Sequence, residues 1–393
     1  MRPINEKYSE LALNLATSTF GVSGFYLLLL FVSFSVSRNA LITGIADSLS
    51  SISLIFSPFL GAWIDSKNYL GEISRYASTL RFLSIIPIAL SLFSRNYYFI
   101  ILSLFSASLI VGLTSDIINS IRSVWVKQNL KGEHLRKGTS LNQTIGTLAD
   151  VVGYLTIGFV LTIGYYPALI IVACVLAATG FTFTKLEKSE VSNSNQTSSL
   201  LSETVDGMKY VWSLVDLRTL FIAYIFFSLI LGFLGVIFTV QTSIFGSLAS
   251  IYLGFILTCL SMGIIIGSTL SWFRQTRISS ILTITTIVIG LAFVLLSFIP
   301  TLLIECAISL LIGITVGVFM VSAMSYIREN TSLEYTARAI GTITSFSQGS
   351  TFIAGSLSGA LIVIIGVSHT ARYVGFFTLL VAIYLFFGFQ KKL

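Results

Sequence analysis

Charged residues are scarce in this 393-residue sequence: 10% are charged, 55% are hydrophobic, and the mean hydropathy is +0.92. Soluble domains have about 25% charged residues, so the composition excludes a soluble globular protein and predicts an integral membrane protein. Cysteine is also rare. Cys174, Cys259 and Cys306 lie within apolar stretches without metal-ligand spacing, so we predict neither a disulfide framework nor a metal site.

Sequence patterns typical of enzymes are absent as well. The two histidines, His134 and His369, lie between apolar stretches, and the sequence has no Walker loop, zincin pair or nucleophile elbow. We therefore expect no enzymatic activity, no cofactor and no transport driven directly by ATP hydrolysis. The net charge is +7, but the basic residues form no patch or known binding motif, so we expect contact with anionic lipid head groups and no nucleic acid partner.

What the sequence does contain is twelve apolar stretches. Each is near the roughly 20 residues that a helix needs to cross a bilayer. The first lacks a cleavage site and is long enough to span, so we expect a retained helix and not a signal peptide. The predicted spans are 11–36, 41–64, 76–93, 97–121, 139–163, 166–183, 219–240, 247–273, 278–299, 301–327, 339–365 and 373–389.

The basic residues alternate with these stretches. Of the 23 Lys and Arg residues, 19 lie in every second gap counted from the N-terminus, and the intervening gaps contain only Arg38, Arg95 and Arg372. Such a bias is the positive-inside signal, which places both termini in the cytoplasm. We predict an all-α, multi-pass protein of the cell membrane with twelve transmembrane helices in two six-helix halves and very short external connections.

The longest interruption, 185–218, separates the two blocks of six spans. We predict an N-terminal half over 1–184, a cytoplasmic linker over 185–217 and a C-terminal half over 218–393. Polar residues 189–199 are typical of a flexible linker. An apolar helical face follows, which predicts an amphipathic helix on the cytoplasmic membrane surface, with a docking site for a partner helix as the alternative. This face consists of Leu201, Val205, Met208, Trp212 and Val215.

The two blocks also resemble each other. Arg136 to Thr139 open the fifth span, and Arg338 to Thr342 open the eleventh with a similar basic and glycine-containing pattern. Two six-helix halves in parallel repeat are typical of secondary transporters that work by alternating access. Chance matching between apolar helices is the alternative.

Segment 58–67, PFLGAWIDSK, is the most specific local pattern, and Arg75 follows it. This segment resembles the signature of the major facilitator superfamily, in which a Gly and an Asp four residues later end the second span. The six-plus-six layout extends the resemblance over the whole chain, and its closest likeness is to the macrolide-efflux and siderophore-exporter branch. Ser66, Asn68 and Tyr69 depart from the basic or glycine residues usual there.

The resemblance implies a gating motif at the cytoplasmic side. Asp65 would act as a latch that meets basic groups in its own loop and the start of the eleventh span, because a carboxylate favours the positive end of a helix dipole. Static charges at the inner membrane interface are the alternative. The expected motif consists of Gly61, Asp65, Lys67, Arg75 and Asp116, with Arg81 as a possible partner of Asp116.

Two carboxyl groups within the predicted spans, Asp150 and Glu305, are candidates for proton coupling. Asp150 lies near the middle of the fifth span, where an ionised carboxylate costs on the order of 3 kcal/mol unless it is paired or hydrated. A hydrogen-bonded carboxyl that ties two helices is the alternative. Glu305 is the second candidate, because the family lines its cavity with the tenth span among others. Asp47 and Glu305 both lie near external ends, where snorkelling to the membrane surface is the alternative.

Other polar side chains within spans are candidates for the substrate cavity, although such groups often only tie helices together. The candidates are Asn14, Thr17, Asn119, Tyr154, Gln241 and Gln348. Glycines at small-residue spacing predict close helix packing, as in Gly263 and Gly267 or Gly355 and Gly359. The fifth span has part of the glycine spacing of family exporters without their proline, which leaves the direction of transport open.

We expect a monomeric secondary transporter that works by rocker alternating access. The expected cargo is a small, apolar or amphipathic organic molecule exported in exchange for protons, and membrane lipids are the remaining partners. Uptake of a small solute is the first alternative. A lipid flippase-like protein and a non-transporting sensor are alternatives of other classes, although the short cytoplasmic segments lack the soluble appendage typical of a sensor.

Overall fold

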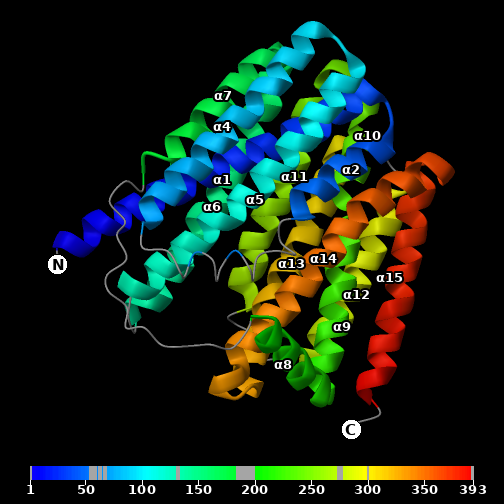
Figure 1. Ribbon diagram of the computed structural model, residues 1–393. Helices are drawn as coiled ribbons and strands as arrows, with labels where there is room; N and C mark the ends of the chain where they lie inside the picture. Colours follow the sequence, from blue (N-terminus) through cyan, green and yellow to red (C-terminus); the bar gives the residue numbers. More distant parts are fainter. Residues whose placement is uncertain are drawn as a thin grey trace.

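The computed structural model describes residues 2–52, 60, 64, 69–129, 133–182, 200–271, 278–298 and 301–390, and nearly all of them are helical (Figure 1). The N half contains α1 (Arg2–Ser37), α2 (Ala40–Ser51), α4 (Leu70–Ser94), α5 (Tyr97–Asn129), α6 (Glu133–Ile163) and α7 (Tyr165–Thr179). The C half contains α9 (Val215–Leu231), α10 (Leu234–Thr242), η2 (Ser243–Leu248), α11 (Ala249–Leu270), α12 (Ile278–Leu296), α13 (Leu302–Asn330), α14 (Leu333–Ile365) and α15 (Val367–Gln390). Helix α8 (Leu200–Ser213) precedes the C half.

Each of the twelve predicted spans overlaps a helix of the structure. Among the residues that the structure describes, eight helical runs are long and apolar enough to cross a membrane, and the apolar helices Tyr165–Thr179 and Val367–Ile383 are shorter. The chain is therefore a multi-pass membrane protein. The number twelve and the cytoplasmic position of both termini remain predictions.

Tight turns join consecutive helices at one end of the molecule, which we call the junction end. Arg38 and Arg95 adopt φ angles of 51° and 53°, and Gly164 and Gly366 adopt 155° and 84°. The Asn39 side chain caps α2 by accepting from the backbone N–H of Leu41 at 2.9 Å. The predicted short connections are confirmed here, and they force consecutive helices to pack antiparallel.

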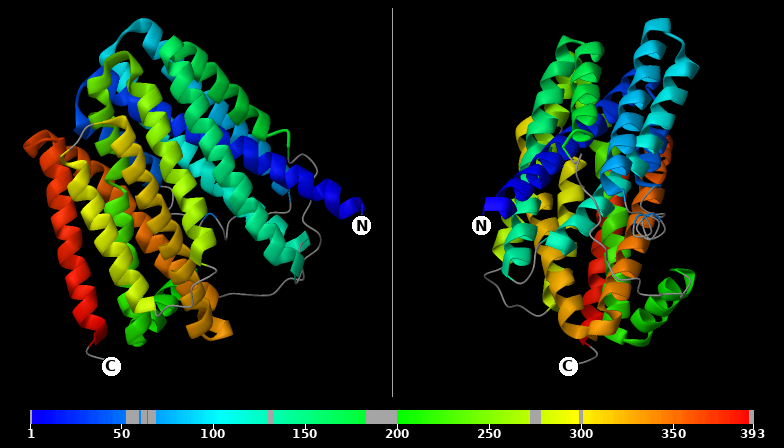
Figure 2. Two further views of the ribbon diagram at one scale, coloured as in Figure 1. Left: turned by 180° about the vertical axis from the view of Figure 1, so that it is seen from behind. Right: turned by 60° about the vertical axis from the view of Figure 1, so that its left-hand side comes forward.

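The two halves meet at the junction end and diverge toward the end that holds both termini (Figures 1 and 2). The main contacts between them are the helix pairs α2–α14 and α6–α11. Small residues make these contacts: a Cβ on Gly158 would lie 2.9 Å from the carbonyl oxygen of Ser250. Ser48 of α2 accepts from the backbone N–H of Ser356 at 2.7 Å and bonds its hydroxyl at 2.8 Å.

Glycines pack helices closely within the C half as well. Gly263 and Gly267 of α11 face Gly313 and Gly317 of α13, and added Cβ atoms there would collide with backbone atoms of the facing helix. The predicted packing role of these glycines is confirmed. Between the halves, Gly355 and Gly359 face α2 in the same way.

The structure divides the predicted span 219–240 into α9 and α10. The division lies at Gly232, where a Cβ would come within 2.5 Å of the Ala354 side chain on α14. Hydroxyl groups of α14 donate to backbone carbonyls around the break, as Ser358 does to Phe233 at 3.3 Å. These bonds satisfy carbonyls that water cannot reach, which a broken helix in lipid requires.

The predicted amphipathic helix is present as α8, but it lies against the start of α14 and α9. Its Tyr210 ring stacks on Tyr335 with centroids 4.4 Å apart, and the Tyr210 hydroxyl accepts from the backbone N–H of Ser332 at 3.3 Å. Val211 is buried and Trp212 is half exposed. Within the predicted apolar face, Met208 packs against the hydrophobic core and Val215 is exposed, so protein covers only part of that face.

Candidate functional site

Asp150 lies on α6 within the N half, near the contact between the halves. Its carboxylate accepts a short hydrogen bond from the Ser23 hydroxyl of α1. The helices approach closely at this point, because a Cβ on Gly153 would lie 2.9 Å from the carbonyl oxygen of Phe20. The carboxyl is therefore fixed against α1, and its side chain keeps partial exposure.

Two tyrosines extend this polar cluster from Asp150 toward the junction end. Tyr154 lies one helical turn beyond Asp150 and interacts electrostatically with Asp150 and Asp47. Tyr26 of α1 lies one turn beyond Ser23, and its hydroxyl and the Asp47 carboxyl both lie next to Gly235 of α10. We call these five residues the carboxyl chain.

Asp47 is the other end of this chain, and its position corrects an expectation. The sequence allows a snorkelling carboxylate near an external end, but the side chain of Asp47 is only 7% exposed. It lies on α2 between Gly44 and Ser48, which both contact α14 of the other half. Snorkelling is therefore wrong for Asp47, because the closed junction buries it.

No basic group neutralises this chain in the part of the molecule that the structure describes: neither Asp47 nor Asp150 forms an ion pair with Lys or Arg there. Buried carboxylates without a cationic partner are costly in a membrane interior, so the neutral, protonated forms are favoured. Proton binding by this cluster remains a prediction.

A second buried polar cluster lies deeper in the N half, around Arg81 of α4. The guanidinium is fully buried and donates to three hydroxyls, those of Thr114 at 3.1 Å, Ser18 at 3.1 Å and Ser115 at 2.8 Å. Asp116 is buried and interacts electrostatically with Arg81. Arg81 and Asp116 thus lie in one cluster, in which hydroxyl groups are the hydrogen-bond partners of the guanidinium.

Arg122 and Asn14 join the same interior. The sequence assigns Arg122 to a cytoplasmic loop, but it lies within α5 and donates to the Asn14 side chain at 3.1 Å. Asn14 is fully buried and donates to Thr182 of the segment after α7 at 2.8 Å. Asn14 therefore ties helices of the N half together, and its contact with a substrate remains a prediction.

Most of the expected gating motif cannot be placed. Gly61, Asp65 and Lys67 lie outside the described residues, and Arg75 lies on the exposed side of α4. The latch between Asp65 and the eleventh span therefore remains a prediction.

The other cavity candidates differ in their surroundings. Thr17 is partly exposed and Asn119 is exposed. Gln241 is buried and donates to the carbonyl of Leu296 at 2.8 Å, so it ties α10 to α12. The side chain of Gln348 lies outside the described part of the chain.

Glu305, the second candidate for proton coupling, lies in the first turn of α13. It is fully buried, and neither carboxyl oxygen has a hydrogen-bond partner among the described residues. Snorkelling is therefore wrong for Glu305 too, and its part in proton coupling remains a prediction.

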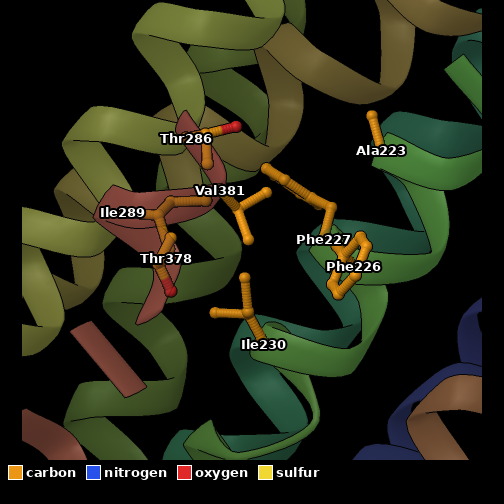
Figure 3. A pocket seen from close by; sticks show the side chains of 8 residues that line it. All are labelled: Ala223, Phe226, Phe227, Ile230, Thr286, Ile289, Thr378 and Val381. Atoms are coloured by element: carbon orange, nitrogen blue, oxygen red, sulfur yellow. The ribbon is translucent and has the colours of Figure 1, made fainter. Parts of the chain in front are cut away.

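A small apolar crevice, with a cavity volume of about 10 Å³, lies inside the C half between α9, α12 and α15 (Figure 3). Phe226, Phe227 and Ile230 line it on one side. The hydroxyls of its two threonines, Thr286 and Thr378, donate to carbonyls of their own helices. The crevice therefore presents apolar surface, and it lies away from the contact between the halves.

Sequence reasoning missed Ser23 and Tyr26 as members of the carboxyl chain. Their spacing of three on α1 and the spacing of four between Asp150 and Tyr154 on α6 each place two polar groups on one helix face. That spacing could have indicated them. The hydrogen bond between Ser23 and Asp150, which are 127 positions apart, depends on the packing of α1 against α6.

Comparison with known proteins identifies the architecture. No family model and no curated protein matches the chain. The nucleoside transporter NupG superimposes with a TM-score of 0.75 at 15% identity, over 97% of this chain and 99% of that chain. The chain therefore shares the fold of this solved structure.

Two further solved structures share this transporter fold. A POT family transporter in complex with 5-aminolevulinic acid gives a TM-score of 0.75 at 12% identity, over 96% of this chain and 95% of that chain. A bacterial homologue of the human lysosomal transporter Spinster, in an inward-facing and unoccupied conformation, gives 0.73 at 10% identity, over 98% and 96%. The predicted resemblance thus holds for the fold, and the macrolide-efflux branch remains a prediction.

Proposed function

We propose that this protein is a secondary active transporter that exports a small, apolar or amphipathic organic molecule in exchange for protons. The observation that carries the proposal is the arrangement of the halves, whose described residues make their main contacts through small side chains at the junction end, beside the carboxyl chain. A contact made by glycine and serine can part and re-form as rigid halves rock. Alternating access follows from that motion.

The charge bias of the sequence supports an orientation for this motion. Nineteen of the 23 basic residues lie in the gaps assigned to the cytoplasm, and the junction-end turns contain Arg38 and Arg95. The junction end would thus be external, and the halves would diverge toward the cytoplasm. The conformation would be inward-facing.

Asp150 is the group that we assign to proton coupling. It is bonded to Ser23, partly exposed, and free of a basic partner among the described residues. A carboxyl in that setting can exchange a proton when its surroundings change between the two states of the transporter. Exchange of a proton for cargo at one site would couple the two fluxes.

The aromatic interior of the C half supports an apolar or amphipathic cargo. Its interior near α9 and α13 contains stacked rings, with Phe227 and Phe319 3.9 Å apart and Tyr224 5.0 Å from Phe319. Glu305 is the one acidic residue buried among the described residues of that half. Apolar and aromatic surroundings favour a ligand that is mostly apolar.

Transport can be tested in proteoliposomes with an imposed pH gradient. Nucleosides, short peptides and apolar drugs form the panel, and a trapped pH dye follows the protons. We expect cargo to move against the direction of proton flow. Co-directional movement would replace efflux by uptake, and absence of flux for all compounds in both directions would overturn the proposal.

Asp150→Asn separates coupling from binding. We expect pH-driven flux to fall at least tenfold, while exchange of labelled for unlabelled cargo across the membrane without a pH gradient continues. Glu72→Gln is the control, because Glu72 is an exposed carboxyl in the first turn of α4. Undiminished coupling in Asp150→Asn would remove this residue from the mechanism.

Asp65 is proposed as the cytoplasmic latch. Loss of its charge in Asp65→Asn weakens closure at the end that holds the termini, so the population open to the cytoplasm rises. Distances between spin labels on Ser123 of α5 and Asn330 of α13 report this population. An unchanged population would make Asp65 a static surface charge.

A further inference from the structure

Two guanidinium groups of the N half lie against α1, and the proposed proton coupling uses neither of them. Arg81 donates from Nη1 to the Ser18 hydroxyl at 3.1 Å, and Arg122 donates from Nε to the Asn14 side chain at 3.1 Å. Asn14 and Ser18 are four positions apart on α1 and share one helix face. The two positive charges therefore reach α1 at adjacent turns.

The carboxyl groups near this pair do not balance its charge. Asp116 is buried and interacts electrostatically with Arg81. Glu10, one turn before Asn14 on α1, is exposed, and no carboxylate among the described residues forms an ion pair with Arg122. Two guanidinium groups thus face one buried carboxyl in the described part of this interior. An anion bound beside Arg122 would supply the missing negative charge.

The two guanidinium groups differ in the donors that they leave open. Each nitrogen of Arg81 donates to a hydroxyl, and the side chain is fully buried, so it is closed to a ligand. Arg122 is partly exposed, and its two Nη groups have no hydrogen-bond partner among the described residues. These Nη groups form the end of the planar fork that pairs with two oxygens of a carboxylate or a phosphate.

The open donors lie on a polar face of α5. Ser115, Asn119 and Arg122 follow one another at steps of four and three, and Asn119 is exposed. Arg122 lies seven positions before Asn129, the last residue of α5, in the part of the helix where the halves diverge (Figures 1 and 2). Exposed Arg and Asn side chains are costly against hydrocarbon, so we expect this face to border the space between the halves.

We propose that Arg122 and Asn119 bind the anionic group of the cargo, a carboxylate or a phosphate, and that Arg81 supports the site by its charge alone. The inference rests on the proposed function, because it narrows the class of cargo to amphipathic anions. Asn14 is a positioning residue, since it holds Nε and leaves the Nη pair for the ligand. The apolar part of the cargo would contact the rings of the C half around Phe227 and Phe319.

The first test compares four compounds that share one ring system and differ in charge: naphthyl phosphate, naphthoate, naphthol and naphthylmethylamine. Equilibrium binding is measured on the purified full chain in detergent. We expect both anions to bind about tenfold more tightly than naphthol, because a bidentate ion pair adds to the same apolar contact. Equal affinities for all four compounds, or a preference for the amine, would overturn the proposal.

Arg122→Gln should remove the preference for anions and leave the affinity for naphthol unchanged. Arg122→Lys keeps the charge and loses the fork, so it should restore only part of the preference. Arg328→Gln is the matched control, because Arg328 is an exposed arginine in the last turn of α13. An unchanged anion preference in folded Arg122→Gln would overturn the proposal.

Asn14→Asp tests the site with Arg122 in place, and it serves if Arg122→Gln does not fold. The new carboxylate stands where the side-chain oxygen of Asn14 accepts from Nε, so it neutralises the guanidinium from within the protein. We expect the anion preference to fall about tenfold. An anion preference equal to that of the unmodified chain would again reject Arg122 as the binding group.

Free phosphate and anionic lipid carry the same chemical group as the proposed cargo, and competition separates these sources. Inorganic phosphate lacks the ring, so it should displace naphthyl phosphate only at about 100-fold higher concentration. Phosphatidylglycerol added to phosphatidylcholine nanodiscs should not displace it. Displacement by either one at a concentration similar to that of naphthyl phosphate would assign the site to free phosphate or to lipid and overturn the assignment to cargo.

These binding measurements use no gradient and no flux. Absence of flux in proteoliposomes would therefore reject the proposed transport and leave the anion site standing. Flux of cargo by a chain that binds naphthol and the anions equally would reject this inference alone.

Discussion

The interiors of the two halves use different chemistry. Between the helices of the N half lie two carboxyl groups of the carboxyl chain and the guanidinium of Arg81, each surrounded by hydroxyl groups. The C half relies on stacked rings, such as Phe227 on Phe319, and on glycine contacts between α11 and α13. The interior of the N half thus contains polar and charged side chains, whereas the interior of the C half relies on apolar contacts.

This difference teaches how the proposed task is divided. A proton-binding group needs hydroxyl neighbours and a controlled supply of water, whereas an apolar ligand needs a surface without unpaired polar groups. Placing the two in separate halves lets each keep its own surroundings. The junction is where the two halves meet, and in the proposed mechanism its contacts would link the protonation of one half to the position of the other.

The largest expected effect breaks the packing of the C half. In Gly267→Ala the new Cβ collides with backbone of Ile314, which cannot move aside as a side chain could. We expect destabilisation by about 3 kcal/mol or more. The thermal midpoint in detergent measures it.

Gly341→Ala is the matched control, since an added Cβ on this exposed glycine of α14 meets nothing within 4 Å. Alanine has the higher helix propensity, so the control should be stabilised by about 0.5–1 kcal/mol. Equal midpoints for the two variants would contradict the role given to close packing.

The next effect concerns the polar interior of the N half. Arg81→Leu removes a buried guanidinium that three hydroxyls accept from and that Asp116 faces. We expect a loss of about 2–3 kcal/mol from these charge-assisted bonds, again measured by the thermal midpoint.

Arg81→Lys sharpens this comparison because it keeps the charge and loses the planar fork of donors. It should recover only part of the stability. Full recovery would show that charge alone matters at this position, and no recovery would assign the whole effect to hydrogen-bond geometry.

The smallest effect on stability, with a clear effect on conformation, is expected at the junction. Gly44→Ala adds a methyl group against the backbone of Gly355 in the other half. The halves can separate to relieve this contact, so we expect the closed junction to lose about tenfold in population while the thermal midpoint changes little. The distance between spin labels on Asn96 and Ser247, which are exposed at the junction end in opposite halves, measures the population of the closed junction.

An unchanged junction with a lowered midpoint would contradict that expectation. It would show that α2 and α14 belong to one permanent packing unit, as α11 and α13 do.

The sequence predicts the helices well because their signal is local. Each apolar stretch overlaps a helix of the structure, and small-residue spacing indicates the glycine contacts at Gly263 and Gly355. The break at Gly232 escapes such reasoning, since the carbonyls freed there are satisfied by hydroxyls of α14 more than 100 positions away. Helix α8 shows the same limit: the sequence predicts its amphipathic pattern but not the stacking of Tyr210 on Tyr335.

The candidate site is predictable in part for the same reason. The sequence alone identifies Asp150 as a candidate, because its carboxyl group lies in the middle of a predicted span. Asp47 lies near a span end, where the same reasoning favours water, and only the contact with Gly235 shows that protein encloses it. Arg122 follows the last apolar residue of its span, yet α5 continues, and Arg122 is partly buried where it donates to Asn14.

The small side chains at the junction have a thermodynamic consequence. Separation of Gly44 from Gly355, or of Gly158 from Ser250, exposes mostly backbone and little hydrocarbon. The heat-capacity change on unfolding or opening scales with the apolar surface exposed, and polar surface contributes with the opposite sign. The balance between the closed and parted junction should therefore vary gently and almost linearly with temperature, so warming or cooling would leave both states populated.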